Sequence, residues 1–405
     1  MTDTTIPEAY KSDHLFLLVG TNPLPNYVAT QLLVVDRATI YLLHSKTTFD
    51  IAQRLKTRIA AAQPSLNVIP REISETDGQK IERQVQEILD GISPKPVPEG
   101  VGLNYTGGTK PMAVHAYRVI KQAFSQGIFS YLDAGSLRMF IAKGDEPTQS
   151  PFVSQELTLE LDELLALHGY KLSKFRRKPE HPEFFLALAQ IHSNPDGFHE
   201  WKGSWDVRKQ SKGWLRTDRP LTTLPTREEY PHLEPIIGLF EENAGDPDQI
   251  ARQLGLETLD SCYKWFDGIW LEEYTLHASK EFADELGIKH YGINLNLHRS
   301  GARDFELDIA AMYGYQLFAI SCIATEVAGK AKEHLMEAFV RARQLGGDEA
   351  RYGVVSCVQN PDALQHEIEQ QWDAEGKVWV FGMYDLPHLA ERLKLWFITA
   401  NKERI

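Results

Sequence analysis

The chain has 405 residues, of which 42% are hydrophobic and 24% charged, and its formal net charge is −13. This length predicts two globular domains, and no repeat or low-complexity tract is visible. Evenly spread, the negative charge would repel nucleic acid, which counts against a simple non-specific coat of DNA.

No apolar run approaches the roughly 18 residues that a membrane span requires. The first residues also lack the basic segment and apolar stretch of a secretion signal, so we expect a cytoplasmic protein without membrane association. Cys262, Cys322 and Cys357 are widely spaced and form neither a CxxC motif nor a His/Cys cluster. They are therefore expected to be reduced thiols, without disulfides or structural zinc.

Residues 1–150 alternate short apolar runs with stretches of helical spacing. Strands are predicted at 15–20, 39–45, 67–73, 101–106, 129–135 and 138–142. Strands that alternate with helices imply βαβ units and a mostly parallel, Rossmann-like sheet. Ligands of such sheets lie beyond the carboxyl ends of the strands.

Regular patterning weakens over residues 151–235, which we interpret as a connecting region. Two segments in it, 171–178 and 202–219, are basic and carry aromatic residues. Such a mixture could follow a phosphate backbone and stack on bases, although a solvated linker face explains it equally well. The aromatic residues are Phe175, Trp205 and Trp214.

Residues 236–405 are predicted to form a second α/β domain. A long helix is expected over 263–287 and another over 330–346. The predicted strands are 293–298, 305–313, 315–324, 352–358 and 377–382.

Two glycine loops follow strands of the first domain: VGTNPLPNY (19–27) and NYTGGTKPM (104–112). In the second loop, Gly107 and Gly108 permit close backbone approach, Pro111 suits a first helical turn, and Lys110 adds a cation. These features predict an anion cradle, although a tight turn before a helix is the simpler alternative. The loop is neither a P-loop nor a GxGxxG dinucleotide fingerprint.

The pair VGTNP and NYTGGTKPM resembles the CARF domain (CRISPR-associated Rossmann fold), over about residues 12–150. CARF domains bind cyclic oligoadenylates made by type III CRISPR complexes, as dimers with the ring across the twofold axis. The resemblance implies a homodimer with a cyclic oligoadenylate, cyclic tetra-adenylate for preference, as allosteric activator. The ligand-contacting residues that it implies are Gly20, Thr21, Asn22, Ser45, Thr47, Asn104, Thr106, Gly107, Gly108, Thr109 and Lys110.

Carboxylates gather in the second half of the chain. Glu272 lies on the predicted long helix, and Glu306 and Asp308 share one face of a predicted strand. Converging carboxylates can hold Mg²⁺ or Mn²⁺, which activates water for phosphodiester hydrolysis. The alternative is that these acids are merely solvated.

The order of helix with Glu, strand with Asp, strand and helix resembles the PD-(D/E)XK restriction-like nuclease fold. The GIWLE and FELD segments also resemble the effectors that join such a nuclease to a CARF domain. The resemblance implies that Asp308, Glu272 and Glu306 hold the metal. However, Ser321 and Ile323 replace the acid and lysine that the family carries on its third strand.

The missing lysine could come from the next helix, or the domain could be inactive. At about 100° per residue, Ala328, Leu335, Phe339 and Ala342 define the expected buried stripe. Lys332 then lies at the edge of the stripe and is the first choice for the catalytic lysine, with Lys330 in reserve. Both could instead be surface lysines.

Arg343 shares an edge with Lys332 and could contact phosphate, whereas His277, His290 and His298 match no zinc motif. The sequence therefore predicts a homodimeric, cyclic oligoadenylate-activated, metal-dependent endonuclease that cleaves RNA, DNA or both. A catalytically inactive sensor or scaffold is the alternative. A third possibility is a first domain that degrades its own ligand.

Overall fold

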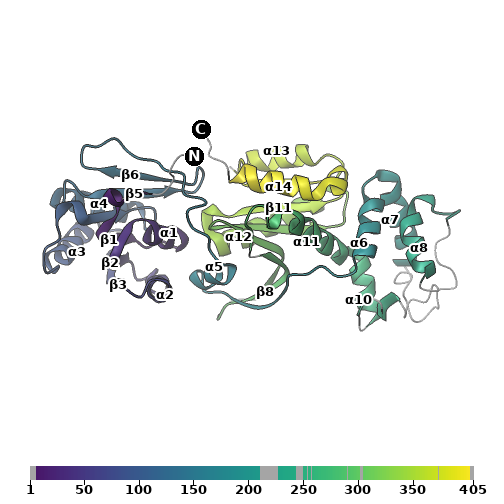
Figure 1. The fold of residues 1–405 in the computed structure, drawn as a ribbon, viewed down its shortest axis with the longest axis horizontal. Helices are drawn as coiled ribbons and strands as arrows, with labels where there is room; N and C mark the ends of the chain where they lie inside the picture. The colour runs from purple at the N-terminus through teal and green to yellow at the C-terminus, as the bar shows by residue number, and fades with distance from the viewer. Residues whose placement is uncertain are drawn as a thin grey trace.

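The computed structural model describes residues 6–209, 227–242, 250–252, 254–256, 258–289, 291–301, 304–372 and 374–401. Three parts follow one another along its long axis: a first sheet with its helices, a second sheet with its helices, and a helical lobe (Figure 1). We call the part around the first sheet the amino-terminal half and the remainder the carboxyl-terminal half.

The first sheet has six strands in the order β3-β2-β1-β4-β5-β6, and all neighbouring pairs are parallel except β5 with β6. The strand order reverses direction between β1 and β4, the kind of position where doubly wound sheets bind ligands. The predicted mostly parallel sheet is confirmed. The strands are β1 (Ser12–Leu18), β2 (Val34–His44), β3 (Asn67–Glu72), β4 (Val101–Asn104), β5 (Ile128–Asp133) and β6 (Arg138–Lys143). The helices are α1 (Leu24–Leu32), α2 (Phe49–Ala62), α3 (Gly78–Asp90) and α4 (Lys110–Ala123).

The second sheet also has six strands, in the order β12-β11-β10-β9-β8-β7. β10, β11 and β12 are parallel, and β7 to β10 are antiparallel. The predicted α/β class is thus confirmed for both halves. The strands are β7 (Lys171–Arg176), β8 (Tyr291–His298), β9 (Phe305–Tyr313), β10 (Gln316–Ile323), β11 (Arg351–Ser356) and β12 (Val378–Phe381).

Helices cover both faces of this second sheet. Along β10, Leu317 and Ala319 pack into one buried cluster, whereas Phe318 and Ile320 pack into another, as alternation along a strand requires. The first cluster includes side chains of α12 and α13, and the second those of α11 and α14. These helices are α11 (Trp270–Ala283), α12 (Ala328–Gly346), α13 (Pro361–Trp372) and α14 (Leu389–Ala400).

The edge strand β7 lies inside the segment interpreted as a connecting region. Its residues Lys171 and Lys174 are exposed, and its pairing with β8 is irregular. Polar edge strands carry little apolar alternation, which explains why the sequence pattern did not reveal it.

The helical lobe is built around aromatic side chains that include Phe184, Phe266 and Trp270, all fully buried. The helix expected over 263–287 is interrupted by a π-helical turn, η4 (Trp265–Ile269), which leads directly into α11. π-Helical turns are frequent at functional sites. The other helices of the lobe are α6 (Pro182–His192), α7 (Pro195–Lys209), α8 (Glu234–Glu242) and α10 (Leu259–Lys264).

The two halves share one hydrophobic cluster, which contains Leu17 of β1 together with Leu317 of β10. Helix α5 (Leu161–Leu167) lies between the halves and packs against α2, α12 and β7. Arg58 and Glu163 add an ion pair between α2 and α5 at 2.5 Å. The sheets are therefore held in one continuous structure.

The three cysteines are buried and unpaired, as predicted. Among the helices that the structure describes, none combines the length and the apolar character needed to cross a bilayer.

Candidate ligand and catalytic sites

The two glycine loops meet beyond the carboxyl ends of β1 and β4, backbone against backbone. A Cβ on Gly107 would lie 2.2 Å from the Leu18 carbonyl oxygen, and one on Gly20 would lie 2.9 Å from the Gly108 nitrogen. Gly108 also has a φ of +76°, which favours glycine. These positions therefore require glycine for close approach and for backbone conformation.

Polar side chains from two loops, after β2 and after β4, converge on Glu75, which follows β3. Thr47 Oγ1 donates to Glu75 Oε2 at 2.9 Å, and Ser45 Oγ lies 2.7 Å from Thr47 Oγ1. Thr109 Oγ1 donates to the Glu75 carbonyl oxygen at 2.5 Å and caps α4 by accepting from the Met112 nitrogen at 3.3 Å. Hydrogen bonds from Ser45 and Thr47 lower the pKa of Glu75. The structure thus brings Ser45, Thr47 and Thr109 together around an acid that sequence reasoning missed.

Asn104 and Thr106 shape the second glycine loop from within. Asn104 is fully buried, donates to Ser130 Oγ at 3.1 Å and accepts from the Thr106 nitrogen at 3.3 Å. Thr106 Oγ1 accepts from the Leu132 nitrogen at 2.7 Å. Both side chains are engaged in holding the loop, whereas Lys110 is exposed at the start of α4.

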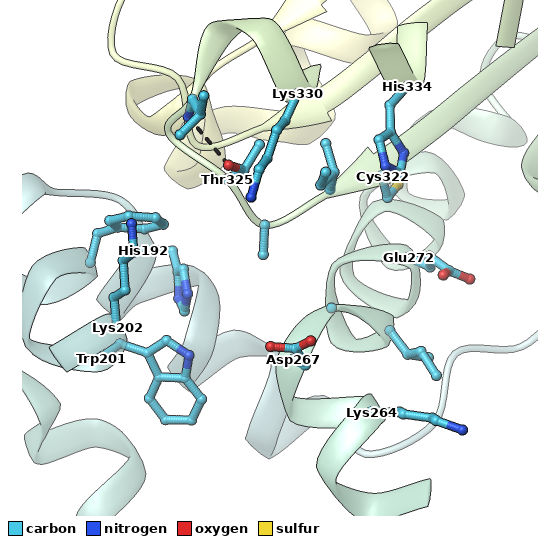
Figure 2. Close-up of a pocket in the computed structure, with 16 residues that line it drawn as sticks. His192, Trp201, Lys202, Lys264, Asp267, Glu272, Cys322, Thr325, Lys330 and His334 are labelled. Atoms are coloured by element: carbon cyan, nitrogen blue, oxygen red, sulfur yellow. Dashed lines mark hydrogen bonds between the residues drawn. The ribbon is translucent and has the colours of Figure 1, made fainter. Parts of the chain in front are cut away.

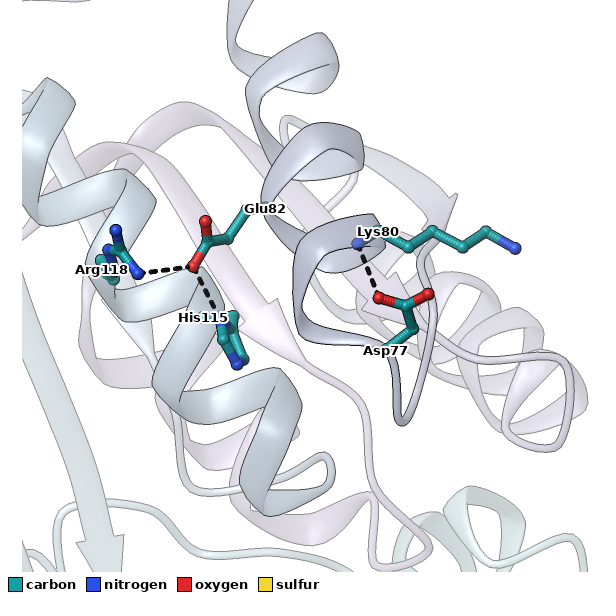
Figure 3. Close-up of polar contacts among 5 residues, drawn as sticks. All are labelled: Asp77, Lys80, Glu82, His115 and Arg118. Carbon is teal, nitrogen blue, oxygen red and sulfur yellow. Dashed lines mark hydrogen bonds and ion pairs between the residues drawn. The ribbon is translucent and has the colours of Figure 1, made fainter.

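Helix α4 is fixed against α3 by polar contacts (Figure 3). Glu82 interacts with His115 Nδ1 at 2.7 Å and accepts from Arg118 at 3.1 Å. Asp77 caps α3 by accepting from the Lys80 nitrogen at 3.1 Å. These contacts set the position of the α4 amino terminus, which carries the second glycine loop.

Asn22 faces the carboxyl-terminal half and does not join the cluster around Glu75. Its Nδ2 donates to Glu349 Oε2 at 2.8 Å, and its Oδ1 accepts from the Leu24 nitrogen at 3.1 Å. Glu349 is 1% exposed, and burial raises its pKa to about 7. The first glycine loop therefore touches both the second glycine loop and the other half of the molecule.

Asp308 lies at the centre of the carboxylate group in the second half. The register of β9 with β10 pairs Ile309 with Ile320, which sets Asp308 opposite Ser321. Asp308 Oδ2 accepts from Ser321 Oγ and from the Cys322 nitrogen, both at 2.8 Å. Burial raises the pKa of Asp308, while these two hydrogen bonds and His334 counteract the rise. Ser321, at the place where an acid was expected, thus orients the acid on the neighbouring strand.

Glu272 approaches the same region from α11, one turn after the π-helical turn. Burial raises its pKa to about 9, and the charges of Asp308 and Glu306 add to the rise. The side-chain amide of Asn294 lies between Glu272 and Arg176. In the orientation that satisfies both, its Nδ2 donates to Glu272 Oε2 at 2.7 Å and its oxygen accepts from Arg176 at 3.2 Å. Burial and Asp308 also raise the pKa of Glu306. The three predicted acids are therefore electrostatically coupled.

The neighbouring Glu273 has a different role. It is 1% exposed, accepts from the Glu180 nitrogen at 2.9 Å, and pairs with Arg176 of β7. It therefore stabilises the attachment of the edge strand and is not available for a ligand.

Two hollows flank the coupled acids. The lysine hollow, about 440 Å³, is shown in Figure 2 and is lined by residues that include Glu272, Lys330, His334, Lys202 and Lys264. The acidic hollow, about 420 Å³, is lined by residues that include Asp308, Glu306, Ser321, His334 and Arg341. His334 borders both hollows, and its Nδ1 lies 3.3 Å from Ser321 Oγ. Sequence reasoning missed His334 because it belongs to no motif.

The two candidate lysines point in different directions. Lys330 reaches from α12 into the lysine hollow (Figure 2), whereas Lys332 Nζ donates to Glu367 Oε1 at 2.6 Å and Gln371 Oε1 at 2.7 Å on α13. The buried stripe of α12 runs through Ala331 and not through Ala328, which is exposed. This difference in phase turns Lys332 away from the acids and reverses the predicted preference.

His277 and His298 form ion pairs with other acids, whereas Lys174 and Arg176 of the first basic segment partly offset the rise in the pKa of Glu306 and of Glu272, respectively. His277 pairs with Glu281 at 3.6 Å and His298 with Asp304 at 2.7 Å, while His290 lies outside the described residues. The Trp205 side chain and the whole of Trp214 also lie outside them. Phe175 packs against the core cluster.

Divalent metal was predicted at the three acids. Among the described residues, no group of three or more His, Cys, Asp or Glu side chains is arranged to hold a metal ion. Mg²⁺ is usually bound by only one or two carboxylates together with substrate phosphates. Asp308 and Glu272 are two desolvated acids that repel each other, and their carboxylate oxygens are suitable ligands for such a cation. The charge of the cation would favour the ionised forms of both acids.

No protein-family model matches the chain, and no curated protein sequence matches it significantly. Among solved structures, Can2 from Sulfobacillus thermosulfidooxidans, in complex with cyclic tetra-adenylate, superimposes with a TM-score of 0.67 and 17% identity, covering 96% of this chain and 98% of Can2. VC1899 from Vibrio cholerae gives a TM-score of 0.68 and 17% identity, covering 97% of this chain and all of VC1899. The chain thus has the two-part fold of these proteins over nearly its whole length.

Proposed function

We propose that the protein is a cyclic oligoadenylate-activated, metal-dependent endonuclease of type III CRISPR defence. The observation that carries the proposal is the pairing, in one chain with the fold of Can2, of a tight glycine-loop site with a separate group of coupled acids beside lysines. Its preferred activator is cyclic tetra-adenylate, the ligand in the Can2 structure.

The amino-terminal half binds the ring. The backbone of Gly107 and Gly108 with the exposed Lys110 suits phosphate, and Ser45 and Thr47 supply hydroxyl groups. Beside Lys110, the outer face of α4 exposes Val114 and Tyr117, at 63% and 36%. A second copy of the chain would cover these side chains, which supports the proposed homodimer.

The carboxyl-terminal half cleaves nucleic acid, RNA or DNA. Asp308 and Glu272, with Glu306 nearby, would hold Mn²⁺ or Mg²⁺, which supplies an activated water for phosphodiester hydrolysis. Ser321 fixes the Asp308 carboxylate, and Lys330 in the lysine hollow stabilises negative charge on the phosphate. Lys202 and Lys264 line the same hollow and attract the nucleic-acid backbone.

The test is a cleavage assay of plasmid DNA, single-stranded DNA and RNA with Mn²⁺, with and without cyclic tetra-adenylate. Cleavage of at least one substrate only when both are present is expected. Ligand binding is measured in parallel by calorimetry. A folded protein that binds the ring and cleaves nothing would contradict the nuclease and favour the alternative, an inactive sensor, which the replacement of the strand acid and lysine by Ser321 and Ile323 supports.

A further inference from the structure

His334 of α12 lies where the lysine hollow and the acidic hollow adjoin. Among the described residues that line them, it is the one that the two hollows share, while Glu272 lines only the lysine hollow and Asp308 only the acidic hollow. Figure 2 shows His334 and Lys330 extending from α12 in the same direction, as residues four apart on a helix do. A phosphate held between the two acids would therefore border the His334 ring.

The hydroxyl of Ser321 determines which nitrogen of the His334 ring carries the proton. Ser321 has one hydroxyl proton, which it donates to the ionised Asp308 carboxylate at 2.8 Å. The Ser321 oxygen can then only accept, and His334 Nδ1 lies 3.3 Å from it, so the ring proton belongs on Nδ1. The other nitrogen of the neutral ring, Nε2, is left as an acceptor.

This Nε2 atom is accessible and unused. The His334 side chain is half-buried, and its Nε2 has no hydrogen-bond partner among the described residues and is not a buried atom. Lys330 beside it has only donors. Glu337, the next acid along α12, pairs with Arg341 at 3.7 Å and lines only the acidic hollow. Figure 2 shows Asp267 on the opposite side of the lysine hollow. His334 Nε2 is therefore the acceptor placed at the boundary of the two hollows.

We propose that His334 Nε2 is the general base of the nuclease, an inference that rests on the proposed function. The oxygen of the attacking water forms a bond to phosphorus, and one ester P–O bond breaks with its electron pair on the leaving oxygen. The water proton moves to Nε2, and the leaving oxygen takes a proton from solvent. The proton on Nδ1 stays on the Ser321 oxygen, so Ser321 is a positioning residue that orients the base, as a third group does in other activated sites.

Cleavage kinetics with Mn²⁺ and cyclic tetra-adenylate test this role, on whichever of RNA and DNA the wild type cleaves. His334→Asn keeps a donor near the position of Nδ1 but removes the acceptor at Nε2. Its kcat should fall about 10²-fold, while KM stays within threefold and the calorimetric affinity for the ring is unchanged. His366→Asn, at an exposed histidine of α13, is the matched control and should change nothing.

Two further readouts separate a base from a structural histidine. Added imidazole should restore part of the cleavage rate of His334→Ala, in proportion to its concentration, and should leave the wild-type rate unchanged. Nitrogen NMR of the metal-free full chain, labelled at the histidine rings, should show His334 with its proton on Nδ1 at mildly alkaline pH. The His334 signals are assigned by their loss in His334→Asn, and Ser321→Ala should remove the preference for Nδ1.

The outcomes distinguish this inference from the proposed function. A wild-type chain that cleaves nothing would overturn both. With an active wild type, four results would each overturn the role of His334 alone: an unimpaired His334→Asn, a loss of cleavage confined to Glu337→Gln, a dominant proton on Nε2, or RNA products that end in a 2′,3′-cyclic phosphate. The last result would show that a ribose hydroxyl, and not water, attacks the phosphate.

Discussion

The glycine-loop site and the carboxylate site are prepared for their ligands in opposite ways. Around Glu75 the polar side chains already bond to one another, and the fit depends on glycine backbones in close contact. Around Asp308 the acids are desolvated, and the charges of Asp308 and Glu306 further raise the pKa of Glu272, so ionising all three acids is electrostatically unfavourable without a cation. The first site therefore depends on shape, and the second on charge.

The largest effect is expected from removing one charge at the carboxylate site. Asp308→Asn keeps the size of the side chain but removes the central carboxylate, so ligand-stimulated cleavage should fall about 10²–10³-fold. Affinity for cyclic tetra-adenylate, measured by calorimetry, should stay the same. Glu333→Gln, an exposed acid on α12, is the control. Cleavage by Asp308→Asn at the wild-type rate would remove Asp308 from the mechanism.

Adding one methyl group should damage the glycine-loop site. In Gly107→Ala the new Cβ would lie 2.2 Å from the Leu18 carbonyl, so the loops must separate and affinity for cyclic tetra-adenylate should fall about 10–100-fold. Gly135→Ala, whose nearest contact would be an ordinary 3.4 Å, is the control. Equal affinity of both variants, measured by calorimetry, would show that the close approach of the loops does not matter for binding.

The two lysines of α12 offer a sharper test of the charge-dependent site. Lys330→Gln should reduce the cleavage rate about tenfold or more, because it removes a cation from the lysine hollow. Lys332→Gln should change the cleavage rate less than threefold, because that lysine bonds to Glu367 and Gln371 of α13 and does not line the lysine hollow. A larger loss in Lys332→Gln would restore the preference read from the sequence.

The last prediction concerns stability and not activity, at the contact between the halves formed by the buried Glu349. Its pKa is about 7 in the folded chain and near the ordinary 4.5 when unfolded, so the folded state holds the proton more tightly. Stability should therefore fall by roughly 3 kcal/mol as pH rises from 4.5 to 7. Glu349→Gln lacks this group, and its stability relative to wild type should rise over that range. Urea unfolding at pH 5 and pH 7.5 measures the free energy of unfolding of both proteins. Parallel pH profiles of variant and wild type would contradict the prediction.

Much of both halves could be predicted from the sequence, for physical reasons. The buried strands of the first sheet are continuous apolar runs, and the glycine loops follow them directly. Glu306 and Asp308 share a strand face by simple alternation. These features depend only on neighbouring residues, so a linear pattern contains them.

Other features depend on contacts between distant residues. The phase of α12 was misjudged because Ala328 and Ala331 are equally apolar, and only the packing on β10 and β11 decides between them. Ser321 gains its role from strand register, and Asn22 from the position of Glu349 in the other half. No linear pattern encodes these directions.

The hydrophobic cluster common to both sheets also bears on modularity. Because Leu17 of β1 and Leu317 of β10 belong to one cluster, cutting the chain near residue 150 would expose apolar surface on both fragments. A fragment of residues 1–150 is therefore a poor vehicle for testing whether this half degrades its own ligand. Exchanging the half for that of another protein with this fold would likewise require redesign of the buried surface, so recombination within the fold is constrained by packing as well as by chemistry.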